Sequence, residues 1–592
     1  MTILEKNIQA LLSGVNEPLG NKLLNFIQNK TCSRFNIDEN LNIYDKTHNV
    51  FMYENLEEEL NFFYQSILEK TPRYPFVCIY GIGNALLIKN LAKHYKHLFV
   101  FESEIELFIL ALSTIDLSEE LKVYKVVLFD CVAKDLEIQI AMIFDQQSIL
   151  EYLSLYEMFI SSHYYLKYYE TSILSLNELC IKSASVAIRN VDITCFLPLL
   201  THGQFLQNIP SMLESIPFQR ILSQRKNKFD NAIVVSAGPS LAKQLPLLKA
   251  CQDKAVIFCA DGALSMLEKE GIVPDYVTNL DFTDLAMKFF QNKENKTSLN
   301  ILSCATHPNV ARSLNAENCM IVLRNKALYQ RFNFNDFGYI DTGTHVSHFS
   351  YTLALALGFK NIIMIGQDLA FDEEGNSHSK GFDFGEKFSG EENIDKLKIP
   401  AYAGKGEVLT HTTWNDYRIK LEYLFACNDQ KAKFYNATEG GARINFTEEL
   451  SFKECCEKLL TKEKPKFELP KSLTKNRSDK LLVKFKEKIQ KDQENAKRFL
   501  DDALALKQIL ENILSKDFIL PLEFLEKVYQ NIENFNHSLD EDEFIQDEVL
   551  RGAFAYRGKL ISDVLKLHIK DETHFITAYI KAYHEWLLYF IE

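Results

Sequence analysis

The residues best suited to chemistry stand in the turn Ser236-Ala-Gly-Pro-Ser240, between a short apolar run and a helical pattern that begins at Leu241. Pro239 suits the first turn of a helix, because the N–H group that proline lacks would have no intrahelical partner there. Gly238 lets a ligand approach the backbone closely, and the free N–H groups at a helix start attract an anion. Ordinary strand-to-helix turns use the same residues. This turn by itself is therefore equally consistent with a ligand site and with a connection that binds nothing.

Acidic residues follow the next two apolar runs. The run 255–260 ends at Asp261, and the run 276–280 is followed by Asp281 and Asp284. Alternation of such runs with helices of about 10–15 residues predicts βαβ units and a parallel sheet. The strand ends then meet at one edge, where α/β proteins bind ligands. Asp281 and Asp284 could hold a Mg²⁺ ion that neutralises a phosphate, and the alternative is that Asp284 caps the next helix.

A second turn, rich in hydroxyl groups, spans residues 341–345 and precedes an apolar helix over 346–357. The next buried strand, 361–365, ends in Gly366-Gln-Asp368. Beyond it, residues 370–406 are rich in Gly, Ser and charge and show little periodicity. So long an irregular stretch inside a compact domain predicts a lid or a binding loop.

A histidine stands at the start of the following helix. His411 precedes a helical pattern that runs through Tyr417 and Leu421, and Thr410 or Thr412 can cap this helix. The partial positive charge at a helix N-terminus disfavours imidazolium, and a neutral ring can accept a proton. His411 is therefore a candidate general base, with a plain polar residue near a cap as the alternative.

Two other histidines, His345 and His348, are three residues apart and could both ligate a metal ion. No carboxylate or cysteine stands beside them at helical spacing, and a helix packed on a sheet often buries a histidine. We therefore expect both to be buried helix residues, whose substitution costs stability more than rate.

Composition excludes some classes of function. The 592 residues carry a net charge of −14, whereas a protein that neutralises nucleic-acid phosphates is usually basic. The 12 cysteines form no CxxC pair, and several fall in predicted strands, which is typical of reduced core residues. The first residues lack the layout of a signal peptide, and no uninterrupted apolar run reaches the length of a membrane span. We therefore expect a cytoplasmic protein without a transmembrane segment or a nucleic-acid partner.

Three regions are expected along the chain. Residues 1–205 predict an N-terminal α/β domain, 206–450 a catalytic α/β domain with a central Rossmann-like parallel sheet, and 451–592 a C-terminal helical domain. In the first region an apolar strand leads into a GxG turn at 81–83, and the next strand ends at Glu102. This is the outline of a nucleotide-binding βαβ unit, but the third glycine is absent. A scaffold domain that kept the fold without the ligand is the simpler interpretation.

Together, these motifs resemble those of the motility-associated factor (Maf) flagellin glycosyltransferases. The resemblance rests on the order and spacing of the Ser-Ala-Gly-Pro-Ser-Leu turn, Gly343 before an apolar helix that ends in Leu357-Gly-Phe-Lys360, the strand end Gly366-Gln-Asp368, and Asn436-Ala-Thr-Glu-Gly-Gly-Ala-Arg443. The same core is similar to the bacterial sialyltransferases that use CMP-sialic acid, with a Gly-Pro-Ser turn, a Gly-x-Asp strand end and a histidine before a helix. The resemblance covers residues 228–446 well and the whole chain loosely.

The resemblance implies an inverting glycosyltransferase. It would move a nonulosonic acid, of the pseudaminic or legionaminic type, from its CMP-activated donor to Ser/Thr hydroxyls of flagellin before export. His411 falls where the sialyltransferases keep their general base, and Thr342–Thr344 fall where the CMP phosphate or the sugar carboxylate binds. The donor-binding residues that the resemblance implies are Ser236, Gly238, Pro239, Ser240, Asp261, Asp281, Thr342, Gly343, Thr344, Asp368, Asn436 and Glu439. No tightly bound cofactor is implied, and Mg²⁺ is an option through Asp281 and Asp284.

One departure concerns the leaving group. Where the sialyltransferases carry tyrosines after the Gly-x-Asp strand, this chain has Leu369-Ala-Phe371, so assistance must come from another residue, with Tyr402, Lys405 and Tyr417 as candidates. Two alternative functions stay open. A pterin pyrophosphokinase would use Mg²⁺-ATP on a related α/β core, and a non-catalytic flagellin-binding motility factor would have a degenerate site.

Overall fold

The computed structural model describes residues 2–14, 16–189, 191, 194–290, 298–388, 395–516, 518, 520–542, 545 and 548–592. The chain forms two compact units. The first unit contains Met1–Cys195, Arg498–Glu541 and Leu550–Glu592, and the second unit contains Phe196–Lys497 and Asp542–Val549. The boundary expected at 205–206 falls inside α11 (Phe196–Glu214), and the one expected at 450–451 falls just before α20 (Phe452–Leu459). Whether three regions fold independently stays a prediction.

The second unit is built around a nine-stranded sheet, counted over the described residues, in which all neighbouring strands run parallel. The strand order is β13-β12-β11-β10-β9-β8-β14-β17-β18. The strands are β8 (Asn231–Val235), β9 (Val256–Ala260), β10 (Tyr276–Asn279), β11 (Leu299–Ser303), β12 (Cys319–Arg324), β13 (Tyr339–Ile340), β14 (Asn361–Ile365), β17 (Lys433–Asn436) and β18 (Glu448–Glu449). The expected α/β fold with a central parallel sheet is confirmed.

This strand order contains a topological switch point. From β8 the chain adds strands toward β13 on one side, and from β14 it adds them toward β18 on the other side. In open α/β sheets the crevice outside the carboxyl ends of the two strands at such a switch binds ligands. The carboxyl ends of β8 and β14 are therefore the place to look for a site.

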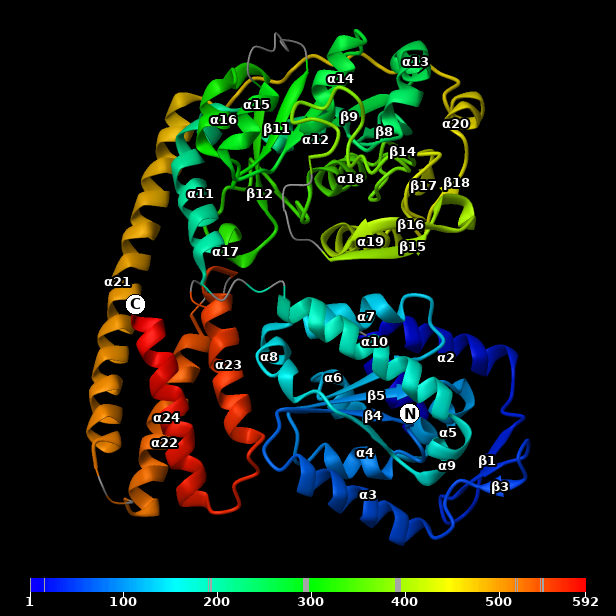
Figure 1. Ribbon diagram of the computed structural model, residues 1–592, viewed down its shortest axis with the longest axis vertical. Coiled ribbons are helices and arrows are strands. Elements are labelled where there is room, and N and C mark those ends of the chain that lie inside the picture. The colour runs from blue at the N-terminus through cyan, green and yellow to red at the C-terminus, as the bar shows by residue number, and fades with distance from the viewer. Residues whose placement is uncertain are drawn as a thin grey trace. The chain divides into compact units, whose positions relative to one another are not determined.

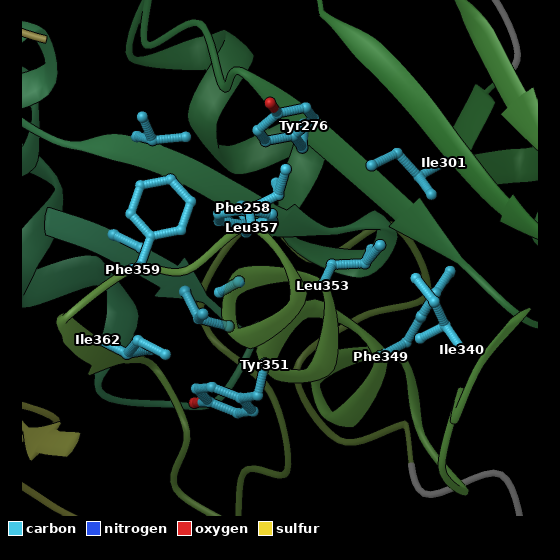
Figure 2. Packing of buried hydrophobic residues seen from close by; sticks show 14 of the residues in the cluster. Phe258, Tyr276, Ile301, Ile340, Phe349, Tyr351, Leu353, Leu357, Phe359 and Ile362 are labelled. Atoms are coloured by element: carbon cyan, nitrogen blue, oxygen red, sulfur yellow. The ribbon is translucent and has the colours of Figure 1, made fainter. Parts of the chain in front are cut away.

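Helices cover both faces of this sheet (Figure 1). Alternate residues of a strand face opposite layers, so that Ala232 and Val234 of β8 join one core cluster and Ile233 and Val235 join the other. Figure 2 shows Phe349, Leu353 and Leu357 in the first cluster. This cluster is covered by α12 (Phe218–Arg225), α18 (Val346–Ala356) and α19 (Thr412–Ala426), and the second cluster by α13 (Leu241–Cys251), α14 (Leu264–Lys269) and α20. The unit also contains the short helices α15 (Met287–Phe290), α16 (Pro308–Ser313) and α17 (Ala327–Gln330).

An antiparallel hairpin stands between β14 and β17 in the chain. It consists of β15 (Lys396–Pro400) and β16 (Glu407–His411), and Lys396 pairs with His411 in its register. Ile399 packs with Ala370 and Ala442 in a small buried cluster, which attaches the hairpin to the segment after β14. The expected irregular stretch over 370–406 thus contains one strand of a hairpin, and its residues 389–394 lie outside the described residues.

The first unit contains a smaller parallel sheet with the order β6-β5-β4-β7. Its strands are β4 (Phe76–Tyr80), β5 (His97–Glu102), β6 (Val126–Asp130) and β7 (Met158–Ile160), and a separate antiparallel sheet joins β1 (Phe35–Ile37), β2 (Ile43–Asp45) and β3 (Val50–Phe51). Its N-terminal helices are α1 (Ile3–Leu12), α2 (Glu17–Asn29), α3 (Leu56–Lys70), α4 (Leu86–Leu91), α5 (Ile105–Thr114), α6 (Ser118–Lys122), α7 (Leu136–Phe144), α8 (Gln147–Leu150), α9 (His163–Tyr168) and α10 (Glu170–Arg189). This part is the expected N-terminal βαβ arrangement.

The C-terminal part of the chain is helical. α21 (Lys475–Leu514) begins in the second unit and ends in the first, where α22 (Leu522–Asp540), α23 (Arg551–Leu565) and α24 (Glu572–Ile591) follow. Trp586 is fully buried and donates a hydrogen bond of 2.8 Å to the carbonyl of Ala553. The buried ion pair between Arg557 and Glu151, 3.0 Å long, joins α23 to the N-terminal part of the same unit. Across the described parts of the chain, no helix combines the length and apolar character that a bilayer crossing requires.

Candidate functional site

The turns after β8 and β14 interlock at the switch point. The Gly238 N–H donates to the carbonyl of Gly366 at 2.8 Å. A side chain at Gly238 would collide with the Asp368 carboxylate and the Gly366 carbonyl, and one at Gly366 would collide with the carbonyl of Ser236. Glycine is therefore required at both positions, and the structure brings together the two turns that the sequence marks.

Asp368 lies against Ser240, the N-cap of α13. Its Oδ2 atom accepts hydrogen bonds from the N–H and the hydroxyl of Ser240, at 3.2 and 2.8 Å. The side chain is buried, and burial raises the pKa of Asp368 to about 6, while the Ser240 hydrogen bonds oppose this rise. One N–H group expected to receive an external anion is thus already bonded to a carboxylate of the protein. The Ala237 N–H makes no hydrogen bond to a described residue.

Ser236 connects the same edge to the start of α18. Its hydroxyl lies 2.7 Å from the Ser347 hydroxyl and donates to Oε1 of Gln367 at 2.9 Å. The hydroxyl-rich turn that precedes α18 therefore stands beside the ends of β8 and β14. In that turn Thr342 is buried and Thr344 is exposed.

Gly343 has a left-handed backbone, with φ of +61°, and faces the ring of His348 so closely that a side chain there would overlap it. His348 is buried, and neither of its ring nitrogens has a hydrogen-bond partner among the described residues. Burial lowers the pKa of His348 to about 4 and that of His345 well below its ordinary value. His345 is the N-cap of α18, and its Nδ1 accepts from the His348 N–H at 3.3 Å.

Asp261 and Asp281 are both engaged in local hydrogen bonds. Asp261 accepts from the Gly262 N–H at 2.7 Å and from the side-chain amide of Asn279, the last residue of β10. Asp281 accepts from the N–H and the hydroxyl of Thr283, at 2.8 and 2.9 Å. Gly262 faces Ala237, so Asp261 stands next to the turn after β8.

Asp284 is exposed at the start of a short 3₁₀ helix, Asp284–Ala286, and Thr283 rather than Asp284 occupies its N-cap position. The expectation that Asp284 caps this helix is therefore wrong, because the Asp281–Thr283 turn places the residue one position too late. No group of three or more His, Cys, Asp or Glu side chains that could hold a metal ion occurs among the described residues.

Asn436 and Glu439, both implied as donor-binding residues, differ in their surroundings. Asn436 is fully buried at the end of β17, its Oδ1 accepts from the Thr438 N–H at 3.1 Å, and its Nδ2 has no hydrogen-bond partner among the described residues. Glu439 is exposed and accepts from the Phe452 N–H at 3.1 Å, at the start of α20. The amide nitrogen of Asn436 is thus buried and unpaired among the described residues, whereas the carboxylate of Glu439 already accepts from the first N–H of a helix.

The residues after Asn436 reach the switch point. Gly440 and Gly441 pack against Asp368, and a side chain at Gly441 would collide with the Asp368 backbone. Gln244 of α13 donates to the carbonyl of Thr438 at 3.1 Å, while its own Oε1 and the Thr438 hydroxyl are buried without partners among the described residues. Unpartnered buried polar atoms are costly, and a bound water molecule or a polar ligand satisfies such atoms. Sequence analysis missed Gln244, since nothing in a helical pattern distinguishes it.

His411 is the last residue of β16 and itself the N-cap of α19. Its Nδ1 accepts from the Trp414 N–H at 3.4 Å, and its ring centroid lies 4.1 Å from that of Trp414. Thr410 donates to the carbonyl of Leu369 at 2.7 Å, and Thr412 is the first helical residue, so the expectation that either threonine caps the helix is wrong. The histidine takes this place because its extended backbone leaves Nδ1 facing the helix start.

The His411 ring is neutral and has one unused nitrogen. Only 3% of the residue is exposed, and burial, with a smaller effect of Lys396, lowers its pKa to about 4. Its Nε2 has no hydrogen-bond partner among the described residues. Because Nδ1 acts as the acceptor of the cap, the proton of the neutral ring stands on Nε2 in this arrangement. The ring therefore presents a donor, and proton acceptance at Nε2 requires the other tautomer.

His411 lies near the segment that follows Asp368. Besides the Thr410 contact, the Phe371 N–H donates to the carbonyl of Leu409 at 2.8 Å, and the Phe371 and His411 rings are 6.1 Å apart. Lys396 stands 4.9 Å over the Phe371 ring. Sequence analysis missed Lys396 and Trp414, because only the hairpin register and the helix start place them beside His411.

The three candidates for leaving-group assistance have different surroundings. The Tyr402 hydroxyl lies 3.3 Å from the carbonyls of Asn436 and Leu450 and donates to them, so its proton is committed. The Tyr417 ring packs 4.7 Å from the ring of His345. Lys405 is exposed.

Comparisons with known proteins bear on this fold. Residues 203–374 match the model of a family described as 6-hydroxymethylpterin diphosphokinase MptE-like. No curated protein sequence gives a significant match. Among solved structures, the chain is similar to the MAf glycosyltransferase from Magnetospirillum magneticum AMB-1, with 16% sequence identity, a TM-score of 0.50, and coverage of 100% of this chain and 97% of that one. The expected resemblance is thus confirmed at the level of the fold: this chain is built, over its whole length, like a Maf glycosyltransferase.

Proposed function

We propose that this chain is a glycosyltransferase that transfers a nonulosonic acid, of the pseudaminic or legionaminic type, from its CMP-activated donor to Ser/Thr hydroxyls of flagellin, with inversion, in the cytoplasm before export. The observation that carries the proposal is the buried, neutral His411, with an unused Nε2, next to the segment that leaves β14. The full-length likeness to a structure named as a glycosyltransferase supports the same class.

The donor would bind at the carboxyl ends of β8 and β14. The open N–H of Ala237, the free amide of Asn436 and the unpartnered Thr438 hydroxyl supply hydrogen bonds there. Lys396, on the hairpin beside His411, supplies a cation for the sugar carboxylate or the departing phosphate. Preorganised donors of this kind stabilise charge that develops as CMP leaves.

His411 would act as the general base for the acceptor hydroxyl. For this role the ring proton must stand on Nδ1, which breaks the cap to Trp414. That cap is a long hydrogen bond of 3.4 Å, so its loss costs the helix no more than about 1 kcal/mol, at the low end for an N-cap. The tautomer that can act as a base, with its proton on Nδ1, therefore forms at little cost in free energy when a bound substrate stabilises it.

The test is a reaction with defined components. The purified chain is mixed with CMP-pseudaminic acid or CMP-legionaminic acid and unmodified flagellin, and the intact mass of flagellin is measured. The proposal expects addition of whole sugar residues and release of CMP. Binding of flagellin without mass addition for either donor would contradict the enzyme and favour a non-catalytic flagellin-binding factor.

A second candidate rests on the family match over residues 203–374, which carries the name of a pterin diphosphokinase. In that case the substrate would be a 6-hydroxymethylpterin and the donor ATP with Mg²⁺. Incubation with these compounds, followed by chromatography for the pterin diphosphate, decides between the two. Formation of that product would overturn the glycosyltransferase proposal.

A further inference from the structure

A cavity of about 500 Å³ lies in the first unit, among α22, α23, α24 and residues of the N-terminal part of that unit. Its walls are aromatic and aliphatic, with Tyr152, Tyr529, Phe575, Tyr579, Ile561 and Leu565 among them. Charged and amide side chains, among them Arg73, Glu526 and Glu533, complete the lining. A cavity of this size is typical of a ligand site. The proposed transferase chemistry, which belongs to the second unit, makes no use of it.

One half of the cavity already holds a guanidinium group of the protein. The guanidinium of Arg73 stacks over the ring of Phe575, 4.0 Å from its centroid. Its Nη2 pairs with Glu572 at 2.6 Å, and its Nη1 donates to the carbonyl of Ile569 at 3.0 Å. An aromatic face and a carboxylate thus bind an arginine side chain there from two sides.

The other half, around Tyr529, contains aromatic rings and carboxylates too. The rings of Tyr529 and Tyr579 lie 4.9 Å apart, and the Tyr579 hydroxyl donates to Glu533 at 3.1 Å. Glu526, on the same helix as Glu533, makes no hydrogen bond or ion pair with any described residue. Aromatic faces and two carboxylates are therefore present, and no arginine or lysine of the described residues pairs with these carboxylates.

The charges around the cavity leave this half negative. Arg73 is neutralised by Glu572, and Arg557, whose charge acts on Tyr152, is paired with Glu151 at 3.0 Å. Burial, followed by Glu533 and Glu572, raises the pKa of Tyr529 to about 12, and Arg73 opposes this rise. Glu526 is exposed and Tyr529 is partly exposed, so a side chain can enter from solvent.

We propose that this unfilled half of the cavity binds the guanidinium of an arginine side chain presented by a partner polypeptide. A planar guanidinium stacks on an aromatic ring and bonds two carboxylate oxygens at once, which an ammonium group does not do. Arg73 shows this mode of binding in the neighbouring half. The proposal does not depend on the transferase activity.

The test uses the full chain and three short peptides, N-acetyl-Gly-Arg-Gly amide and its citrulline and lysine counterparts, titrated by ligand-observed NMR. Citrulline keeps the shape of arginine and removes the charge. We expect binding of the arginine peptide in the range of about 0.1–1 mM, at least about fivefold weaker binding of the lysine peptide, and no measurable binding of the citrulline peptide.

Variants then locate the site. Glu526→Gln combined with Glu533→Gln is expected to weaken the arginine peptide about tenfold, and Tyr529→Leu about threefold. Glu523→Gln is the matched control, because Glu523 lies on α22 too but pairs with Lys527 at 2.9 Å. Equal binding of the citrulline peptide, no arginine binding up to about 5 mM, or an equal effect of the control variant would overturn the proposal.

Discussion

Two strand–turn–helix motifs, at 81–84 and 236–240, have a similar glycine-containing turn and differ in which groups bond to it. In the first unit, Glu102 accepts hydrogen bonds from Ile82 N–H at 3.1 Å and from the Tyr165 hydroxyl at 2.6 Å. The remaining N–H groups of the turn bond to the carbonyl of Phe101 and to the hydroxyls of Tyr165 and Tyr53. No N–H of this turn is left for a ligand.

The second turn is only partly closed. Asp368 bonds to Ser240, as Glu102 bonds to Ile82, but the Ala237 N–H has no partner among the described residues. The same is true of the amide nitrogen of Asn436, on the neighbouring strand β17. Glycine makes room for other groups of the protein in both places. In the first turn, Gly81 and Gly83 make room for Tyr165 and Tyr53, and in the second turn Gly238 makes room for Asp368 and the Gly366 carbonyl. A glycine turn therefore marks close approach, and the approaching group can be the protein itself.

The largest effect is expected from the residue that gives the second site its chemistry. His411→Asn keeps a good N-cap for α19 and removes the imidazole, so the fold and CMP binding should persist while the transfer rate falls by about 10²–10⁴-fold. The measurement is the rate of flagellin modification at saturating donor. His345→Asn, which preserves the cap of α18 in the same way, serves as the control. Its transfer rate should fall by less than about tenfold. Equal losses in the two variants would remove His411 as the base.

The next largest effect is expected from Glu102, which closes the first turn by its hydrogen bonds. Glu102→Ala leaves the buried N–H groups of Ile82, Ser103 and Glu104 without their acceptor and should lower the free energy of unfolding by about 3 kcal/mol. Chemical denaturation measures this loss, and CMP affinity should be unchanged within about twofold. A variant that stays fully stable but loses nucleotide binding would show that the first turn is the ligand site.

A smaller effect concerns Asp368. An anionic phosphate nearby would raise the pKa of this carboxyl further above its value of about 6, so CMP binding should take up a proton and weaken as the pH rises from about 6 to 8. Asp368→Asn removes the charge, and we expect it to bind CMP about three- to tenfold more tightly than the wild type at pH near 8.

The variant also controls for the phosphate of CMP, which titrates near pH 6 itself. Calorimetric titrations of both proteins across this pH range should converge at low pH and diverge at high pH. Parallel curves would mean that the donor phosphate binds away from Asp368.

The smallest effect is expected from metal removal. The carboxylate of Asp281 already accepts two hydrogen bonds from Thr283, and Asp284 is exposed beside it. We expect EDTA to change the transfer rate by less than about twofold. Two results together would contradict this and show that Asp281 and Asp284 bind a metal ion. EDTA would have to abolish the activity, and Mg²⁺ would have to restore it in the wild type but less in Asp281→Asn.

The fold of the second unit could be predicted because its signals are local. Alternating apolar runs and helical patterns predict the parallel sheet, and the residues after each run predict its functional edge. The position of His411 at a helix start follows from the same pattern. These features depend on neighbours within a few residues along the chain.

What could not be predicted depends on residues far apart in the sequence. The Tyr165 hydroxyl accepts from the Gly83 N–H although the two residues lie far apart in the sequence, and Asp368 bonds to Ser240 across the switch point. Glu439, which resembles a donor-binding residue by position, is used to cap α20. The tautomer of His411 depends on a single hydrogen bond to Trp414, which only the three-dimensional arrangement reveals.

A crystal structure of the chain with CMP shows directly whether the second turn binds the donor while the first is closed. We expect the nucleotide at the carboxyl ends of β8 and β14, with its phosphate near the Ala237 N–H and the amide of Asn436, and no ligand at residues 81–84. CMP bound at the turn of the first unit, with Tyr165 displaced from Gly83, would contradict it.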